Sequence, residues 1–279
     1  MYFCEVNVGQ RIFNFYINSS IHVSLAVVSL LMITNYYLQI SVDLSLIFFV
    51  FFGSITGYNF VKYLGISKLH RNHLTSSFKG IRIFTFVSFL LALYFLLKQP
   101  IQSIVVAFIT GFLTVLYALP IFSKGKNLRN INGLKIFVIA FTWSLVTVIL
   151  PVENAEIPLD FTVFILGFQR FLFVFVLMLP FEIRDLKFDA LALGTIPRRI
   201  GVRNTKLVGF VVLFLIYLLE IFAIGTGFEK NLSMLSIAIS IFLFLLFSTT
   251  NQNKYYASFW VEAIPIFWFV LLWGLSQLF

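Results

Sequence analysis

The chain has 279 residues, of which 60% are hydrophobic and 11% charged, and its formal net charge is +9. Soluble globular domains are only about 45–50% apolar, so this composition excludes a single water-soluble domain and indicates that lipid is the solvent. The positive charge alone would suit a nucleic-acid partner, but the distribution of basic residues along the chain argues against one.

The N-terminal segment differs from a secretory signal. Its first twenty residues mix Glu5, Arg11 and several asparagines with apolar residues, and no short apolar run is followed by a small-residue cleavage site. The only cysteine, Cys4, cannot form an intrachain disulfide and makes no metal site alone. We therefore expect no processed leader and no disulfide framework.

Apolar runs long enough to cross a bilayer recur along the chain. About twenty apolar residues span the hydrocarbon core as a helix, and a backbone in lipid must satisfy its own hydrogen bonds, so the spans are expected to be helices. We predict an all-α membrane bundle in one domain, residues 1–279, with the first and second spans, and the third and fourth, paired as hairpins. The nine predicted spans are Ile21–Ile40, Leu44–Val61, Ile81–Leu97, Ile101–Phe122, Leu134–Val152, Phe161–Phe181, Leu207–Gly225, Leu232–Phe247 and Phe259–Phe279.

The basic residues gather on one side of this bundle. If the N-terminus is cytoplasmic, alternation of the spans places 17 of the 20 Lys and Arg on the cytoplasmic side, whereas Lys98 and Lys230 fall outside and Arg170 falls within a span. Cytoplasmic loops of membrane proteins carry such an excess, which explains most of the net charge without nucleic acid. We expect an integral protein of the cytoplasmic membrane whose polar cytoplasmic loops cap the bundle and carry function. These loops are residues 62–80, 123–133 and 182–206.

Arg170 lies in the middle of the sixth predicted span, in the stretch LGFQRFLF. A charge at that depth is costly, so it indicates a structural pair or a functional site. We expect it to face the bundle interior and to pair with Glu220, in the seventh span, or with another polar group. A polar group in a binding cavity and a transport pathway are the other interpretations. A transporter would also have inverted repeats or broken helices, and the sequence shows no clear pair of these.

The stretch FEIRDLKFDALALGTIPRRIG, residues 181–201, places Asp185 and Asp189 four residues apart at the end of the sixth span. On a helix that continues past the membrane, both carboxylates would share a face. Carboxylate oxygens suit Mg²⁺, which usually completes its coordination with water and substrate phosphate. Phosphate oxygens could also be held directly by Arg184, Arg198 and Arg199. The alternative is a solvated helix end, because acidic pairs at this spacing are common on helix surfaces.

This stretch resembles the second aspartate-rich motif of the UbiA superfamily of intramembrane prenyltransferases. In that motif a helix ends in Arg-Asp-x-x-x-Asp and a Thr-x-Pro-x-x-x-Gly stretch follows, matched here by residues 184–189 and 195–201. The nine-span layout and the stretch LYALPIF, residues 116–122, before a basic loop are also similar.

The resemblance implies a helical bundle around a lipid-open cavity, in which two aspartate-rich motifs hold Mg²⁺ on the diphosphate of an isoprenoid donor. The metal and basic residues would stabilise the leaving diphosphate, and an aromatic or other lipophilic nucleophile would attack the allylic carbocation. In this family the loop after the fourth span can add cations, which here would be Lys124, Lys126 and Arg129. Membrane topology alone also explains these three residues.

The first motif departs from the family pattern, which is Asn-Asp-x-x-Asp-x-x-x-Asp at the end of the second span. The matching stretch is GYNFVKYLGIS, in which Asn59 is retained but Phe60, Tyr63 and Ser67 stand at the aspartate positions. No acidic residue occurs between residues 43 and 153. One side of the metal clamp therefore lacks its carboxylates, and metal affinity is expected to be weak.

Two interpretations follow from the resemblance. The chain is a divergent enzyme that uses one Mg²⁺, with Lys62 and Lys68 taking part of the diphosphate charge, or it is a non-catalytic relative that binds isoprenoid lipid or acts as a membrane scaffold. The intact second motif favours an enzyme that moves an isoprenoid chain from an allylic diphosphate to an aromatic or lipid acceptor. Glu262, at the start of the last span, would serve the acceptor or extend to the membrane interface.

Overall fold

The computed structural model describes residues 8–63, 76–121, 127–131, 133–187, 194–224 and 227–278. Every regular element in these residues is a helix, and they contain nine helical stretches long and apolar enough to cross a membrane. The predicted all-α class and the nine spans are confirmed, with boundaries that differ by a few residues at most ends. The chain is an integral multi-pass membrane protein.

The first five spans occupy the N-terminal half of the chain. They are α2 (Ile21–Leu38), α3 (Leu44–Tyr63), α5 (Ser76–Leu96), α6 (Ile101–Ala118) and the continuous run of α7 (Leu134–Ser144), π-helical η3 (Leu145–Ile149) and α8 (Leu150–Asn154). The last four are α9 (Phe161–Asp185), α10 (Ile196–Leu219) with π-helical η4 (Glu220–Ile224), α11 (Phe228–Phe247), and π-helical η5 (Tyr256–Val261) with α12 (Ile264–Ser276). Two short helices lie outside the spans, α1 (Val8–Asn18) and the 3-10 helix η2 (Leu128–Asn130).

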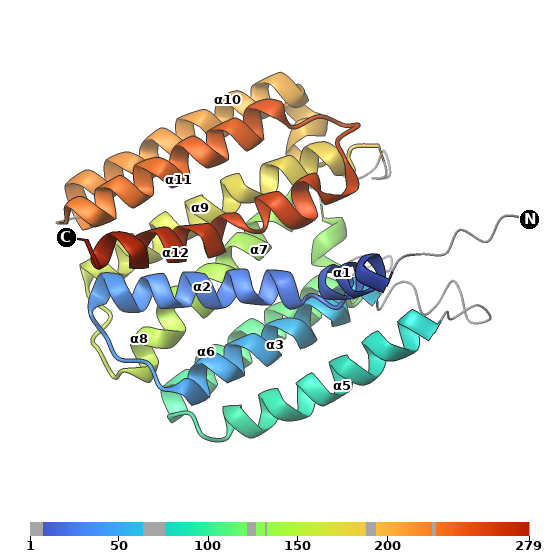
Figure 1. The fold of residues 1–279 in the computed structure, drawn as a ribbon, viewed down its shortest axis with the longest axis vertical. Helices are drawn as coiled ribbons and strands as arrows, with labels where there is room; N and C mark the ends of the chain where they lie inside the picture. The colour runs from blue at the N-terminus through green and yellow to red at the C-terminus, as the bar shows by residue number, and fades with distance from the viewer. Residues whose placement is uncertain are drawn as a thin grey trace, which may run out of the picture.

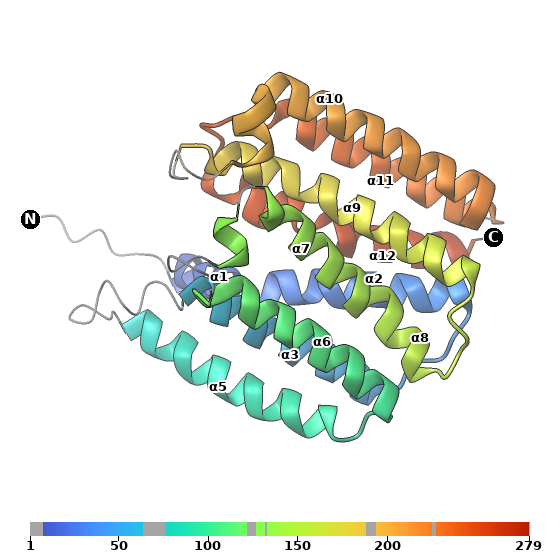
Figure 2. The same ribbon diagram turned by 180° about the vertical axis from the view of Figure 1, so that it is seen from behind.

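Most consecutive spans are packed neighbours, and the last one closes on the first. The helix α2 packs against α3, α7 against α9, α9 against α10, α10 against α11, and α11 against α12, which returns to α2. In both views of the ribbon, α5 lies at one edge of the bundle and α10 and α11 lie at the opposite edge (Figures 1 and 2). Short connections favour this order because they join antiparallel neighbours.

The third and fourth spans break this order. The helix α5 packs on α3, and α6 packs on α3, α7 and α8, but within the described residues α5 and α6 are missing from the main helix pairs. Gln99 anchors the turn between them: its Nε2 donates to Ser45 Oγ at 3.0 Å, and its Oε1 accepts from Asn154 Nδ2 at 2.9 Å. The predicted hairpin of these two spans is wrong as a packed unit, because their facing sides line a cavity. The hairpin of α2 and α3 is confirmed.

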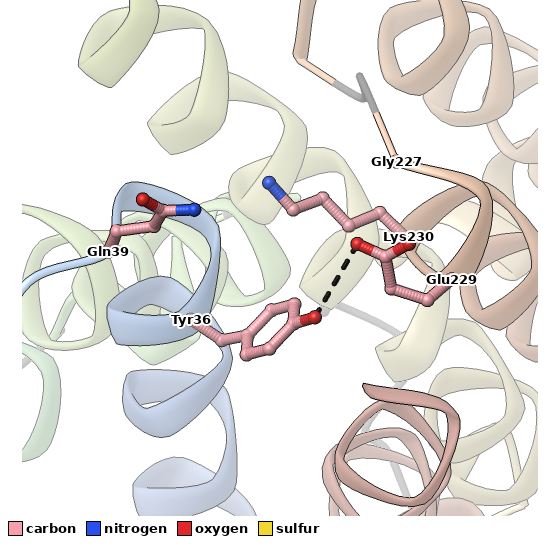
Figure 3. A pocket seen from close by; sticks show the side chains of 5 residues that line it. All are labelled: Tyr36, Gln39, Gly227, Glu229 and Lys230. Carbon is pink, nitrogen blue, oxygen red and sulfur yellow. Dashed lines mark hydrogen bonds between the residues drawn. The ribbon is translucent and has the colours of Figure 1, made fainter. Parts of the chain in front are cut away.

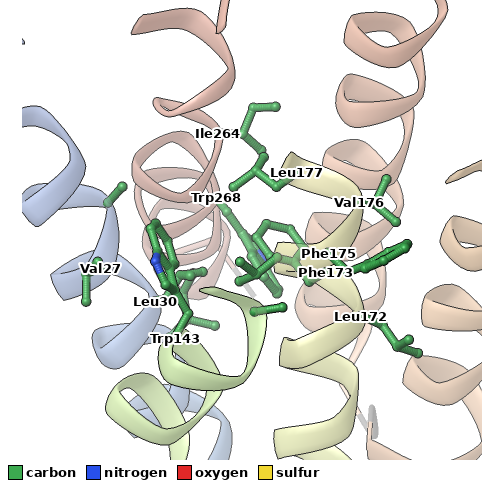
Figure 4. Packing of buried hydrophobic residues seen from close by; sticks show 14 of the residues in the cluster. Val27, Leu30, Trp143, Leu172, Phe173, Phe175, Val176, Leu177, Ile264 and Trp268 are labelled. Atoms are coloured by element: carbon green, nitrogen blue, oxygen red, sulfur yellow. The ribbon is translucent and has the colours of Figure 1, made fainter. Parts of the chain in front are cut away.

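The interior is centred on α9, whose side chains are buried along most of its length. It lies between α7 on one side and α10, α11 and η5 on the other. Figure 4 shows Phe173 of α9 packed near Trp268 of α12, with ring centroids 5.0 Å apart. Lipid tails are as apolar as these rings, so close packing rather than exclusion from water holds the helices together. A rigidly packed α9 gives its C-terminal end a fixed position.

Candidate functional site

A cavity of about 2270 Å³ is lined by residues of α2, α3, α5, α6, α7, α9 and the segment that leads into α12. Most of its wall is apolar, with Phe89 of α5 and Phe112 of α6 as examples. Phe86 and Phe108 line it too, yet they are 62% and 74% exposed. The cavity therefore opens sideways between α5 and α6, where lipid tails lie, and suits a long apolar ligand.

One end of this cavity is polar, and we call it the mouth. Consecutive spans run in opposite directions, so the C-terminal ends of α3, α6 and α9 meet the N-terminal ends of α5 and α7 there. The charged side chains that line the mouth are Lys62, Lys79, Arg82, Arg129, Lys135, Arg184, Asp185, Lys254 and Glu262. The mouth is thus a basic site joined to an apolar cavity.

The second motif begins at the mouth with two carboxylates that share one lysine. Glu182 and Asp185 lie about one turn apart at the end of α9, and Lys135, in the first turn of α7, approaches both. Its Nζ is 3.0 Å from Glu182 Oε1 and 3.4 Å from Asp185 Oδ2. Arg184 Nε lies 2.8 Å from Asp185 Oδ1. Because Lys135 is only 8% exposed, solvent screens its pairs less than it screens surface ion pairs.

The sequence interpretation missed Glu182 and gave Lys135 no role in the site. The spacing of Glu182 and Asp185 in FEIRD is a local signal for one helix face, and it could have identified Glu182. No comparable signal connects Lys135 with Asp185, because fifty residues separate them. Only the packing of α7 on α9 brings the lysine to this motif.

The remainder of the second motif is described only in part. The helix α9 ends at Asp185, and Asp189 lies outside the described residues, so their predicted shared helix face is untested. Arg198 Nη2 donates to the carbonyl oxygen of Leu186 at 2.9 Å. Neither Arg198 nor Arg199 lines the cavity, so the structure does not bring the two predicted phosphate contacts to the mouth.

Two side chains of the first motif, Asn59 and Tyr63, make structural hydrogen bonds and supply no carboxylate for a metal. Asn59 is 2% exposed, and its Oδ1 accepts from Ser20 Oγ at 2.8 Å. Its Nδ2 donates to a backbone carbonyl at 3.0 Å and to Thr85 Oγ1 at 2.8 Å. Tyr63 OH donates to a carbonyl at the end of α1 at 2.7 Å. These bonds tie α3 to the α1–α2 turn and to α5.

Two of the other predicted cations line the mouth. Lys62 Nζ donates to the carbonyl oxygen of Asn18 at 3.1 Å, and Arg129 lines the mouth from η2. The remaining predicted residues of the first motif and of the basic loops lie outside the described residues; these are Ser67, Lys68, Lys124 and Lys126.

The last span contributes Lys254 and Glu262 to the mouth. They flank η5, and Glu262 directly follows this π-helix. Such turns are frequent at functional sites because the extra residue displaces neighbouring side chains. Glu262 lines the mouth together with Lys62 and Arg184. The mouth therefore has carboxylates on two sides, on α9 and next to η5.

The other two residues predicted to lie in the cavity are elsewhere. Arg170 is 1% exposed, and it donates to a backbone carbonyl of α2 at 2.8 Å and to Thr34 Oγ1 at 3.3 Å. Glu220 accepts from Tyr37 OH and Gln169 Nε2, each at 2.8 Å. Neither Arg170 nor Glu220 lines the cavity, and no ion pair joins them in the described chain. Arg170 thus faces the interior and pairs with polar groups of α2, whereas the expected partner Glu220 bonds to Tyr37 and Gln169.

A smaller pocket of about 400 Å³ lies at the C-terminal end of α2, away from the mouth. Its lining residues are Tyr36, Gln39, Gly227, Glu229 and Lys230 (Figure 3). Tyr36 OH donates to Glu229 Oε1 at 3.5 Å, and one lysine and one glutamate balance in charge. This pocket has neither the apolar volume nor the basic excess of the cavity.

The described residues do not fit the two-metal arrangement that the resemblance implies. Among them, no three His, Cys, Asp or Glu side chains gather as a metal site. Mg²⁺ prefers hard oxygen ligands in near-octahedral geometry. The first-motif side offers the bonded Asn59 and Tyr63, and a metal on Asp185 would lie beside Lys135 and Arg184. The donor set of the mouth suits an anion better than a dication.

Comparison with known proteins gives a likeness of fold. The sequence matches no family model and no curated protein. The apo structure of a UbiA homolog from Aeropyrum pernix K1 is 12% identical, with a TM-score of 0.68 over 92% of this chain and 98% of that one. A UbiA homolog from Archaeoglobus fulgidus bound to DMAPP and Mg²⁺ is 10% identical, with a TM-score of 0.64 over 95% and 100%. A digeranylgeranylglyceryl phosphate synthase is 16% identical, with a TM-score of 0.54 over 95% and 97%. The fold of this chain is that of UbiA homologues.

Proposed function

We propose that this chain, which has the fold of UbiA homologues, is a divergent intramembrane prenyltransferase of the UbiA superfamily. It would move an isoprenoid chain from an allylic diphosphate to an aromatic or lipid acceptor. One observation supports this most directly: a single cavity joins a lipid-open apolar body to a basic mouth. Structural neighbours bound to DMAPP or GPP support the same class of donor.

The residues of the mouth would act on the diphosphate. When the bond between the allylic carbon and the diphosphate oxygen breaks, negative charge develops on the leaving group and positive charge on the carbon. Arg184, Lys62 and Arg129 would stabilise the departing oxygens, because preorganised cations lower the free energy of such charge separation. The apolar wall would exclude water from the carbocation until the acceptor attacks.

The acceptor would lie on the side of the last span. Glu262 lines this part of the cavity together with Tyr58, whose hydroxyl accepts from Trp143 Nε1 at 2.5 Å. A carboxylate there can accept the proton that the acceptor nucleophile loses as the new bond forms. We therefore assign Glu262 and Tyr58 to acceptor binding.

Mg²⁺ is the cofactor that the sequence predicts, on Asp185 and Asp189, and neighbours contain it. The described side chains do not fit the metal arrangement, so we propose no step through a metal. Asp185 would position Lys135 and Arg184 through its two ion pairs.

The test is a turnover assay on protein reconstituted in lipid nanodiscs. Labelled dimethylallyl, geranyl and geranylgeranyl diphosphates would be supplied with a membrane lipid extract, with Mg²⁺ or with EDTA, and products followed by mass spectrometry. We expect a prenylated lipid and released diphosphate from the wild type. Arg184→Gln should lower the rate on the order of a hundredfold, whereas Arg203→Gln, an exposed arginine outside the cavity, should not.

No product from any allylic diphosphate, in an assay where a UbiA homologue is active, would contradict this function. Saturable binding without turnover would favour the alternative, a non-catalytic relative that holds isoprenoid lipid. The transporter interpretation has less support, since Arg170 and Glu220 do not border the cavity.

A further inference from the structure

We propose that the mouth binds the diphosphate group directly through its lysines and arginines, without a divalent metal. This inference rests on the proposed function and specifies how the same site recognises its donor. In a site built from two aspartate-rich motifs, carboxylates need metal ions between them and the phosphate. Here basic side chains would contact the phosphate oxygens in place of the metal ions.

The described part of the mouth carries an excess of positive charge. Among the described residues, seven basic side chains and two carboxylates line the cavity, and a third carboxylate, Glu182, pairs with Lys135 beside it, which leaves a net charge of +4. Such an excess focuses a positive potential in a site with low-dielectric walls. Five of the seven cations, Lys62, Lys79, Arg82, Arg129 and Lys254, are exposed and can reach a bound ligand, so a multiply charged anion is the ligand that this group complements. A dication would add to the excess.

The amide of Asn59, in the first motif, is already fully hydrogen-bonded. Asn59 uses its amide oxygen and nitrogen in bonds to Ser20, Thr85 and a backbone carbonyl. Breaking this buried set to free one metal ligand would cost the hydrogen bonds that join α3 to α5 and to the α1–α2 turn. Next to it, Lys62 lines the mouth where an acidic motif would be. This side of the site has exchanged negative charge for positive charge.

Three carboxylates of the described chain lie at the mouth: Glu182, Asp185 and Glu262. Asp185 lies between Lys135 Nζ at 3.4 Å and Arg184 Nε at 2.8 Å. Glu262 lines the same mouth as Lys62 and Arg184. Glu182 and Asp185 thus offset two cations of the mouth, Lys135 and Arg184, and hold them in place. The bond from Arg184 to Asp185 uses Nε, so the outer edge of the guanidinium is not part of that bond and can approach phosphate oxygens.

Cations from separate elements surround the position proposed for the phosphates. Lys62 comes from α3, Arg184 from α9 and Lys254 from the segment before η5, so cations approach from three separate elements. Surrounding cations on fixed helices can contact several oxygens of a diphosphate without rearrangement, which is the advantage that a metal ion normally provides.

The experiment measures binding of geranylgeranyl diphosphate to the full chain in lipid nanodiscs by calorimetry, with EDTA and with Mg²⁺. We expect saturable binding in EDTA, with a Kd within about threefold of the Mg²⁺ value, and weaker binding as salt rises. Lys62→Gln and Lys254→Gln should each raise the Kd in EDTA on the order of tenfold. Lys206→Gln is the matched control, because Lys206 lies outside the cavity lining and contacts the carbonyl of Leu246.

Asp185→Asn separates the two interpretations by whether its effect depends on Mg²⁺. A metal ligand lost at this position would abolish Mg²⁺-dependent binding, whereas loss of a residue that only positions Lys135 and Arg184 should change the Kd by the same factor with EDTA and with Mg²⁺. Thermal melting of each variant would show that it is folded. Binding that vanishes in EDTA and returns with Mg²⁺, or an equal loss in Lys206→Gln, would overturn the inference and leave the proposed function standing. Absence of binding in both conditions would overturn both.

Discussion

Arg170 is a buried cation whose charge is accommodated without a direct ion pair. Its Nη1 donates to Leu30 O at 2.8 Å, its Nη2 donates to Thr34 Oγ1 at 3.3 Å, and its guanidinium lies 5.4 Å from the ring centre of Trp268. Glu220 is close enough to interact with it electrostatically. The helices α9, α2 and α12 therefore meet at one side chain, which satisfies a charge that lipid could not.

We predict that Arg170→Leu destabilises the bundle without affecting the cavity. The change leaves a buried carbonyl and Glu220 without their cationic neighbour, so the free energy of unfolding should fall by about 2 kcal/mol or more. Thermal unfolding in detergent would show a lower midpoint, whereas the exposed control Arg203→Leu should melt like the wild type. Diphosphate binding should persist below the melting range. An unchanged midpoint would indicate instead that Arg170 reaches the membrane surface.

At the scale of one element, α10 is divided by Gly201. The residues after Thr195 begin a helix with Pro197 in its first turn, where a missing N–H costs nothing. Gly201 then has φ 82° and ψ 158°, a backbone conformation that residues with a Cβ rarely adopt. Beyond it the helix resumes, and Thr205 Oγ1 donates to Gly201 O at 2.8 Å. The glycine of the TIPRRIG stretch thus lets the chain leave the mouth and enter the next span.

We expect Gly201→Ala to lower the free energy of unfolding by about 1–3 kcal/mol, because its backbone conformation is strained for alanine. No atom lies within 4 Å of the added Cβ, so a clash would not contribute. Gly274→Ala in α12 is the control: its Cβ would also meet open space, and its backbone is helical. Equal melting temperatures for the two variants would refute the backbone argument.

For the whole molecule, the two ends of the bundle differ in charge. The mouth is basic, whereas the connections at the other end carry Asp43, Glu153, Glu156 and Asp160. An excess of Lys and Arg at one end is the pattern that orients membrane proteins, with the basic end inside. The mouth would then face the cytoplasm.

We predict opposite accessibility for cysteines at the two ends. In a Cys4→Ser background, Gln39→Cys at the end of α2 should react with a membrane-impermeant maleimide in intact cells. Asn127→Cys, next to η2 at the mouth, should react only after the membrane is permeabilised. The double substitution adds no charge, so it should not alter orientation. Labelling of Asn127→Cys from outside would refute this topology.

The sequence by itself determined the class, the number of spans and the end of α9 at which charged residues gather. These features depend on the length of apolar runs and on spacing along one helix, which are local properties. The resemblance of residues 181–201 to a UbiA motif likewise predicted the fold that the structural comparison confirms.

Only the tertiary structure decided which groups meet. Asp185 has Lys135 as a partner from fifty residues away, and Arg170 bonds to Leu30 from 140 residues away, in place of the predicted Glu220. It also showed that α5 and α6 stay apart and open the cavity, although a short turn joins them. The sequence of an apolar helix says little about which helix it will pack against, because in lipid any apolar helix or lipid tail offers it a similar environment. The choice of partners is made by close packing and by a few buried polar contacts, and both exist only once the bundle has assembled.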